Sequence, residues 1–272
     1  MTGLTADETA MLEQALTEAH ADDGRTIIPS NSPTLLIDET ASRFSSAQWF
    51  EEIGKQTVTL AGVGGIGSYV AFLLSRVKID KLVMFDPDIV EEANMSGQLY
   101  GSHNVGHAKV SAMSSFMRDY SRFFNVVACH EPYGISSPVT NIMMCGFDNM
   151  NARRVFFVKW RDHVLNMPEE ERHKCLFIDG RLAAEEFQVL CIKGTDQFLM
   201  QKYEEEWLFS DHEAEPTLCS YKQTSFCANM IASVMVNLVV NFVANLCEPL
   251  IERELPFLTA YDAERMYFKT EL

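Results

Sequence analysis

The feature that most constrains the fold is an unbroken succession of strand, glycine loop, helix and second strand between residues 57 and 86. The β-rich run 57–61 leads directly into a glycine loop, and the apolar run 81–85 ends at an aspartate. This order predicts a βαβ unit, whose two strands lie parallel in one sheet. We therefore expect an α/β fold of the Rossmann-like, doubly wound kind, with a largely parallel sheet and helices on both faces.

The glycine loop, residues 62–67, reads GVGGIG and satisfies the spacing G-x-G-x-x-G through Gly62, Gly64, Gly65 and Gly67. Glycine permits a tight turn and lets backbone N–H groups approach phosphate oxygens, while the following helix N-terminus adds partial positive charge. Asp86 comes 19 residues after Gly67, where a carboxylate would meet ribose hydroxyls. These observations alone favour NAD binding, with a purely structural glycine turn as the alternative.

The rest of the chain continues the alternation of helices and strands. We predict helices over residues 68–77, 106–120 and 150–166, and strands over 126–129, 141–147, 176–179 and 187–192. A long helix follows Thr224, and residues 257–270 alternate in the manner of a C-terminal β-hairpin. Residues 1–50 are expected to form an N-terminal arm with helices over 5–20 and 45–54, followed by one domain over residues 51–272.

Composition limits the class of protein and its partners. Of the 272 residues, 47% are hydrophobic, which is enough for a sizeable core. The 38 acidic residues outnumber the 22 basic ones, which argues against a nucleic acid as a main partner, because phosphate backbones need clustered Lys and Arg. The seven cysteines lie mostly in apolar runs and include no C-x-x-C pair, so reduced thiols and a cytoplasmic location are expected.

Residues 225–247 carry no charge over 23 positions, a length sufficient to span a bilayer. A polar residue recurs there at every fourth position, which places a polar stripe along a helix. The stripe consists of Asn229, Ser233, Asn237, Asn241 and Asn245. Because asparagine side chains are costly in lipid, we expect a long, largely buried helix at a packing or subunit interface, and no membrane span.

The residues that follow Asp86 separate an ATP site from an NAD site. The segment 86–98 reads DPDIVEEANMSGQ and resembles the D-x-D-x-V-x-x-x-N-x-x-R-Q segment of the ThiF/MoeB/E1-like superfamily. Residues 106–109, GHAK, resemble that family's G-x-x-K, and residues 148–153, DNMNAR, resemble its strand-end D-N-x-x-x-R. The motifs occur in the family's order, so the resemblance covers roughly residues 40–250 and is more specific than the glycines alone.

The resemblance implies a binding site for Mg·ATP around the glycine loop. Asp86 would accept hydrogen bonds from both ribose hydroxyls, and Lys109 would place a compact cation on the triphosphate. Asp148 follows an apolar strand and would bind Mg²⁺ at the edge of the crevice. Asn94 would donate to phosphate oxygens without adding charge, and Gln98 would complete the nucleotide contacts.

Each of these residues also has a simpler interpretation. Asp148 and Asn149 could cap the helix that follows them, a role compatible with Mg²⁺ binding. Lys109 could be an ordinary solvated lysine on an amphipathic helix. Asp88 could be a loop charge, or it could orient Lys109.

The sequence departs from the family pattern at the triphosphate. Gly97 stands where the family has an arginine that contacts the ATP phosphates, and losing such a contact costs about 1.5–3 kcal/mol. Arg43, in the segment SRF, resembles an N-terminal R-[YF] motif that reaches the partner subunit's triphosphate in relatives, which favours a homodimer; a surface arginine is the alternative. The C-x-x-C zinc pairs of many relatives are missing, so we expect no metal other than Mg²⁺.

A cysteine nucleophile is a further expectation from the resemblance. Cys219 lies in a polar stretch before the long helix, and its surroundings resemble the family's P-x-C-T with one extra residue. Lys222 and His212 stand near it in the sequence and could stabilise a thiolate. Cys227, which opens an apolar helix, is the second candidate, and an unreactive loop cysteine is the alternative for Cys219.

The resemblance therefore implies an ATP-dependent adenylyltransferase. A carboxylate, expected to be the C-terminus of a ubiquitin-like or ThiS/MoaD-like protein, would attack the α-phosphate and release pyrophosphate, leaving an acyl-adenylate. The expected catalytic residues are Arg43, Lys109, Asp148 and Cys219. Two alternatives stay open: a catalytically inactive ThiF-like protein that binds a nucleotide or holds a partner, and an NAD-dependent oxidoreductase.

Overall fold

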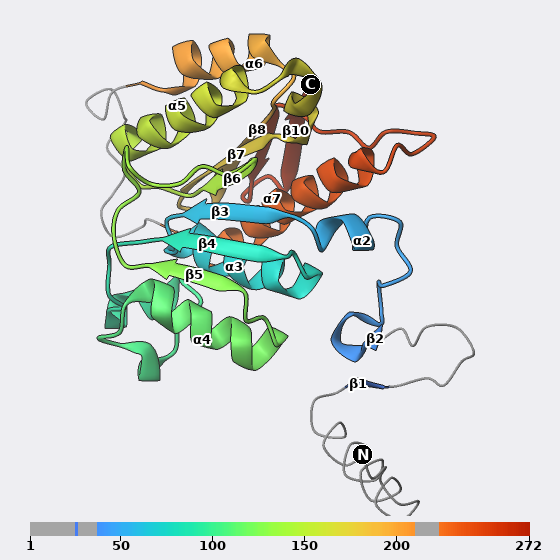
Figure 1. Ribbon diagram of the computed structural model, residues 1–272. Coiled ribbons are helices and arrows are strands. Elements are labelled where there is room, and N and C mark those ends of the chain that lie inside the picture. Colours follow the sequence, from blue (N-terminus) through green and yellow to red (C-terminus); the bar gives the residue numbers. More distant parts are fainter. Residues whose placement is uncertain (1–24, 27–36, 210–222) are drawn as a thin grey trace, which may run out of the picture. The chain divides into compact units, whose positions relative to one another are not determined.

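The computed structural model describes residues 25–26, 37–209 and 223–272 (Figure 1). The chain divides into two compact units, Met1–Ala47 and Gln48–Leu272. In the first unit, β1 (Arg25–Thr26) pairs antiparallel with β2 (Ile37–Asp38), and a 3-10 turn, η1 (Glu39–Ala41), follows. The helix predicted over residues 5–20 lies outside the described residues.

Eight strands of the second unit form one sheet (Figure 1). They are β3 (Thr57–Ala61), β4 (Lys81–Phe85), β5 (Val126–Cys129), β6 (Ile142–Cys145), β7 (Leu176–Ala183), β8 (Glu186–Lys193), β9 (Leu258–Asp262) and β10 (Tyr267–Glu271). Their order is β10-β9-β8-β7-β6-β3-β4-β5. The strands from β7 to β5 are mutually parallel, whereas β8, β9 and β10 extend the sheet with antiparallel pairing. The predicted Rossmann-like α/β fold and the C-terminal hairpin are confirmed.

Helices cover both faces of the sheet, as predicted (Figure 1). The buried side chains of α3 (Gly65–Val77), α4 (Lys109–Ser121) and α7 (Ser225–Leu246) share one apolar cluster. Those of α5 (Met150–Asn166) and α6 (Gln197–Lys202) share a second cluster on the opposite face. The remaining short elements are α2 (Phe50–Ile53), the 3-10 segments η2 (Glu92–Ser96), η3 (Ser102–Asn104) and η4 (Glu169–Lys174), and the π segment η5 (Tyr203–Trp207).

The boundaries of several elements differ from the prediction. The helix α3 begins at Gly65, inside the glycine loop rather than after it, because the loop's last glycines already belong to the first helical turn. The strands β7 and β8 are longer than predicted, since they pair with each other from Leu176↔Lys193 to Ala183↔Glu186. The helix predicted over 45–54 is reduced to the single turn of α2.

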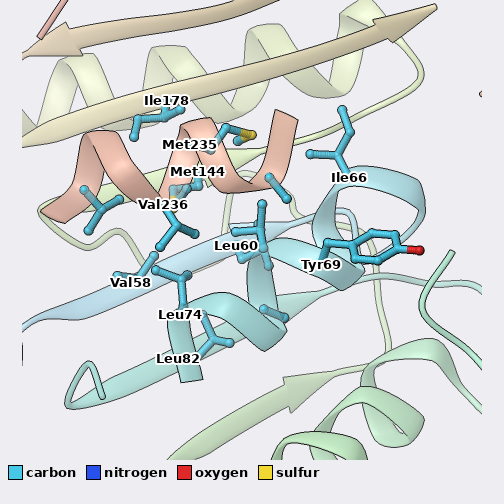
Figure 2. Packing of buried hydrophobic residues seen from close by; sticks show 14 of the residues in the cluster. Val58, Leu60, Ile66, Tyr69, Leu74, Leu82, Met144, Ile178, Met235 and Val236 are labelled. Carbon is cyan, nitrogen blue, oxygen red and sulfur yellow. The ribbon is translucent and has the colours of Figure 1, made fainter. Parts of the chain in front are cut away.

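Helix α7 is, within the described part of the chain, the helix that is long and apolar enough to cross a membrane, with a mean hydropathy of 1.9. Of the apolar 18-residue stretch of α7 that is long enough to cross a membrane, 56% is buried in the fold. Figure 2 shows Met235 and Val236 packed among residues of the parallel strands and of α3. The polar positions Asn229, Ser233 and Asn237 are exposed, so the predicted polar stripe lies on the outer side of a largely buried helix.

The first core cluster makes the fold sensitive to cavities, and Leu74 of α3 tests this. Its side chain is fully buried near Leu60 and Leu82 (Figure 2). Leu74→Ala is expected to lower the free energy of unfolding by about 2–5 kcal/mol, because it removes apolar contacts and leaves a void. Urea denaturation measures this loss, with the fully exposed Leu250→Ala as a matched control. A loss below about 1 kcal/mol at Leu74 would contradict the packing described.

Candidate nucleotide-binding site

The glycine loop connects β3 to α3 by close backbone contacts. Gly62 has a φ of +83°, and a Cβ placed on it would lie 3.1 Å from the carbonyl oxygen of Gly146, which follows β6. A Cβ on Gly67 would lie 1.8 Å from the carbonyl oxygen of Gly62. Gly64 is the N-cap of α3 and brings no side chain to cap the helix. The first helical turn of α3 therefore receives no hydrogen bond from an N-cap side chain, and a helix N-terminus of this kind is suited to bind an anion.

Asp86 holds the glycine loop in place from the end of β4. Its carboxylate is buried and accepts the Val63 N–H at 2.7 Å and the Asp88 N–H at 2.9 Å, through different oxygens. Burial raises the pKa of Asp86, although the two backbone donors and then Lys109 act in the opposite direction. Each carboxylate oxygen keeps a lone pair beyond these bonds, so Asp86 is also able to accept a ribose hydroxyl.

Lys109 is a buried lysine, with an exposed fraction of 6%, at the first position of α4. Its Nζ lies 2.8 Å from Oδ2 of Asp88, and its backbone N–H donates to the Asp88 carbonyl at 3.0 Å. Asp88 therefore orients Lys109, and the alternative of an ordinary solvated lysine is wrong. An ammonium group has three N–H donors, so donors remain for a phosphate beside this ion pair.

Tyr100 joins Lys109 to the glycine loop, a role that the sequence analysis missed. Its buried hydroxyl donates to the Val63 carbonyl at 2.6 Å and lies 3.4 Å from the Lys109 carbonyl. Burial, followed by the charges of Asp86 and Asp88, raises the pKa of Tyr100 well above its usual value. A tyrosine in an irregular segment gives no sequence signal for such a contact.

Asn94 lies within η2, and Gln98 follows η2 and lies near the glycine loop. The Oδ1 of Asn94 accepts the Glu91 N–H at 2.8 Å, so the side chain also stabilises its own turn. The Nε2 of Gln98 lies 3.8 Å from the position of a Cβ on Gly64. Its Oε1 is buried and has no hydrogen-bond partner within the described part of the chain. Buried polar atoms are nearly always paired, so this oxygen is available to a hydrogen-bond donor next to the loop.

Asp148 follows β6 and is exposed. Asn149, rather than Asp148, caps α5, because its Oδ1 accepts the Ala152 N–H at 2.8 Å. The Gly146 N–H donates to the Ala61 carbonyl at 3.2 Å, which places the chain before Asp148 beside the glycine loop. The described residues contain no group of three or more potential metal ligands. Asp148 is the carboxylate at this position that could hold a Mg²⁺ ion, which proteins commonly bind through one or two carboxylates together with phosphates and water.

A buried ion-pair network centred on Asp179 contacts the backbone next to Asp148, and it was not predicted from the sequence. Asp179 of β7 is fully buried and accepts Nε of Arg153 at 2.7 Å, Nε of Arg181 at 2.8 Å and the Tyr203 hydroxyl at 2.9 Å. Burial opposes the charged carboxylate, but Arg153 and then Arg181 outweigh it, and the pKa of Asp179 is lowered. Arg153 also donates to the Phe147 carbonyl at 2.7 Å, so the network holds the backbone next to Asp148.

The sequence model of the ThiF family matches residues 38–271. The chain belongs to the ThiF family. The family assignment predicted from the four motifs is thereby confirmed.

The relatives of this ThiF-family chain include ubiquitin-activating-type enzymes. Ubiquitin-like modifier-activating enzyme 5 of Bombyx mori is 41% identical over 93 residues, which cover 34% of this chain and 23% of that protein. The enzyme of the same name from Drosophila willistoni is 30% identical over 158 residues, which cover 52% of this chain and 38% of that protein. The chain thus matches well under two thirds of the length of these curated relatives.

Solved structures share the fold of this ThiF-family chain at low sequence identity. PaaA has a TM-score of 0.65 and 16% identity, and the match covers 98% of this chain and 83% of PaaA. MccB of Escherichia coli, crystallised with ATP, has a TM-score of 0.60 and 13% identity, covering 99% and 79%. At such identity the likeness establishes the fold alone.

The structure brings most predicted site residues of this ThiF-family chain to the same end of the sheet. They gather after β3, β4 and β6 and comprise Gly62, Gly64, Gly65, Gly67, Asp86, Asp88, Asn94, Gln98, Lys109 and Asp148. Arg43 belongs to the unit Met1–Ala47 and is exposed. Cys219, together with Lys222 and His212, lies outside the described residues. Cys227 is fully buried, and burial raises its pKa, so this thiol is unsuited to act as a nucleophile.

Proposed function

We propose that this chain binds Mg·ATP and transfers the AMP group to a carboxylate. The observation that carries the proposal is Lys109, a buried ammonium held by Asp88 next to a glycine loop that opens a helix. A buried cation is costly unless a compensating charge is present, and Asp88 is itself 62% exposed. A triphosphate would supply further negative charge at this point, where α3 adds its own partial positive charge.

The reaction follows from these groups. An oxygen of the substrate carboxylate forms a bond to the α-phosphorus, and the bond from that phosphorus to the bridging oxygen breaks, so pyrophosphate leaves with the electron pair. Lys109 and the first-turn N–H groups of α3 would stabilise the negative charge that develops on the phosphate oxygens. Asp148 would bind Mg²⁺, which neutralises phosphate charge when present. Asp86 would orient the ribose, and with it the α-phosphate.

The proposed substrate is the C-terminus of a small protein or peptide. Two comparisons support this class: the relatives are enzymes that activate ubiquitin-like modifiers, and MccB has been crystallised together with MccA and AMPCPP. We also propose that the chain acts as a cytoplasmic homodimer. The six described cysteines are free, which is compatible with a reducing compartment.

A second candidate function is a nucleotide-binding protein without turnover. Gly97 favours it, because the family's arginine at this position would contact the phosphates. The NAD-dependent oxidoreductase has no comparable support once the chain is placed in the ThiF family.

Calorimetry with ATP and exchange of labelled pyrophosphate into ATP together test the proposal. We expect ATP binding by the chain alone, and exchange that appears when a co-encoded ubiquitin-like protein or its C-terminal peptide is added. Asp148→Ala is expected to lower exchange at least about tenfold and to shift its Mg²⁺ dependence to higher concentration, with the exposed Asp119→Ala unchanged. ATP binding without exchange would favour the inactive protein, and neither binding nor exchange would refute adenylation. Changes in nicotinamide fluorescence would instead favour the dehydrogenase.

A further inference from the structure

Gln223 lies against the glycine loop, although it is far from the loop in the sequence. It directly precedes Thr224, the N-cap of α7, and its backbone forms an isolated parallel bridge with Ala184 after β7. A Cβ placed on Gly65 would lie 2.0 Å from Oε1 of Gln223 and 2.6 Å from its Nε2. The carboxamide of Gln223 therefore covers Gly65, the first residue of α3, at the position that a side chain on residue 65 would occupy.

The same carboxamide also covers Gly97. A Cβ placed on Gly97 would lie 2.9 Å from Nε2 of Gln223 and 3.0 Å from its Cγ. Because these distances are shorter than normal contacts, a side chain at position 97 and the present side chain of Gln223 compete for one space. Position 97 is the position at which the family pattern has its phosphate-binding arginine, so Gln223 lies where the side chain of that arginine would begin.

We propose that Gln223 is a nucleotide-contacting residue, whose carboxamide replaces the guanidinium absent at position 97 and donates to the phosphates bound at the N-terminus of α3. The inference rests on the proposed function, because it requires a nucleotide in the glycine loop. The carboxamide has two N–H donors and no charge, so it is able to pair with a phosphate oxygen at the glycine loop. Phosphates bind at the N-terminus of a helix that follows a glycine loop, which is where Gly65 and Gln223 meet.

Two substitutions of Gln223 separate a phosphate contact from a packing role. Gln223→Ala removes the donor, and the affinity for ATP is expected to fall about fivefold to tenfold. Gln223→Glu keeps the shape but places a carboxylate at the phosphates, and the affinity for ATP is expected to fall more than about thirtyfold. Adenosine has no phosphate, so its affinity should change less than about twofold in both variants. Gln201→Ala, at an exposed glutamine of α6, is the control.

A double substitution tests whether positions 97 and 223 share one space. Gly97→Arg in the wild-type background is expected to change ATP affinity less than about threefold, because the carboxamide of Gln223 obstructs the new side chain. In the Gln223→Ala background the same substitution is expected to raise ATP affinity at least about tenfold, since the guanidinium then reaches the phosphates. The two effects are thus strongly non-additive. If Gly97→Arg changed ATP affinity equally in both backgrounds, the idea that side chains at positions 97 and 223 compete for one space would be contradicted.

The possible outcomes distinguish this inference from the proposed function. If the wild-type chain binds neither ATP nor adenosine, the nucleotide site itself is wrong, and the role of Gln223 is lost with it. If the wild-type chain binds ATP and both Gln223 variants bind it equally well or more tightly, only the role of Gln223 is refuted. A parallel loss of adenosine and ATP affinity in either variant would reveal a packing role and would equally refute the phosphate contact.

Discussion

Lys109→Met is expected to lower the rate of ATP–pyrophosphate exchange by at least about 100-fold, because the chain loses the buried cation of the proposed phosphate site. The stability of the fold should change little. The partner Asp88 is 62% exposed, so water is able to solvate its carboxylate once the ammonium is gone. Methionine retains the length and the apolar part of the lysine side chain.

The measurement combines exchange kinetics with urea denaturation of the same preparations. Lys55→Met is a matched control, since Lys55 is also paired with carboxylates but its side chain is 56% exposed. Lys55 precedes β3 in the sequence and does not belong to the proposed site. We expect full exchange activity in this control. An exchange rate within about threefold of wild type for Lys109→Met would show that Lys109 is not part of the reaction site.

Asp179→Ala is expected to lower the free energy of unfolding by about 3–5 kcal/mol, because it leaves two guanidinium groups in the interior without their carboxylate. Arg153 has an exposed fraction of 4%, so water cannot replace the missing charge. The loss should exceed that of an exposed substitution such as Asp119→Ala, for which we expect a change within about 0.5 kcal/mol. Equal stability of the two variants would contradict the network.

The same network gives a direction for the dependence of stability on pH. The pKa of Asp179 is lowered in the folded chain, so its ionised form contributes stability above the pKa of an unfolded aspartate. That contribution is lost as the pH falls through the lower, folded pKa. The stability difference between wild type and Asp179→Asn should therefore be largest near neutral pH and shrink in acid. Denaturation series at several pH values measure it.

Much of the fold was predictable because its signals are local. The glycine spacing, the apolar runs and their order are sufficient to identify a βαβ unit and its continuation. The lengths of β7 and β8 were not predictable, because their extra residues are strands only through pairing with each other. The start of α3 was also missed, since Gly65 and Gly67 have low helix propensity and become helical through contacts such as that between Gly67 and Gly62.

The residues of the candidate site also differ in how far local sequence predicts them. Asp86, Lys109 and Asp148 were identified because they stand at fixed spacings in motifs, and the ion pair of Lys109 with Asp88 follows one of those motifs. The positions of Asp179 and Gln223 were missed, because each side chain contacts segments remote in the sequence. A carboxylate on an apolar strand was the available signal for Asp179, since such a residue is rarely buried without a charged partner.

The two hydrogen bonds of Val63 have a consequence for the energetics of binding. Its N–H is bound by Asp86 and its carbonyl by Tyr100, so the backbone of the loop is secured on both sides by the protein itself. A ligand would meet a preorganised receptor, and little conformational entropy would be lost on association. Affinity at this loop is then set by the charges and donors around it, and single-residue changes there should translate directly into binding free energy.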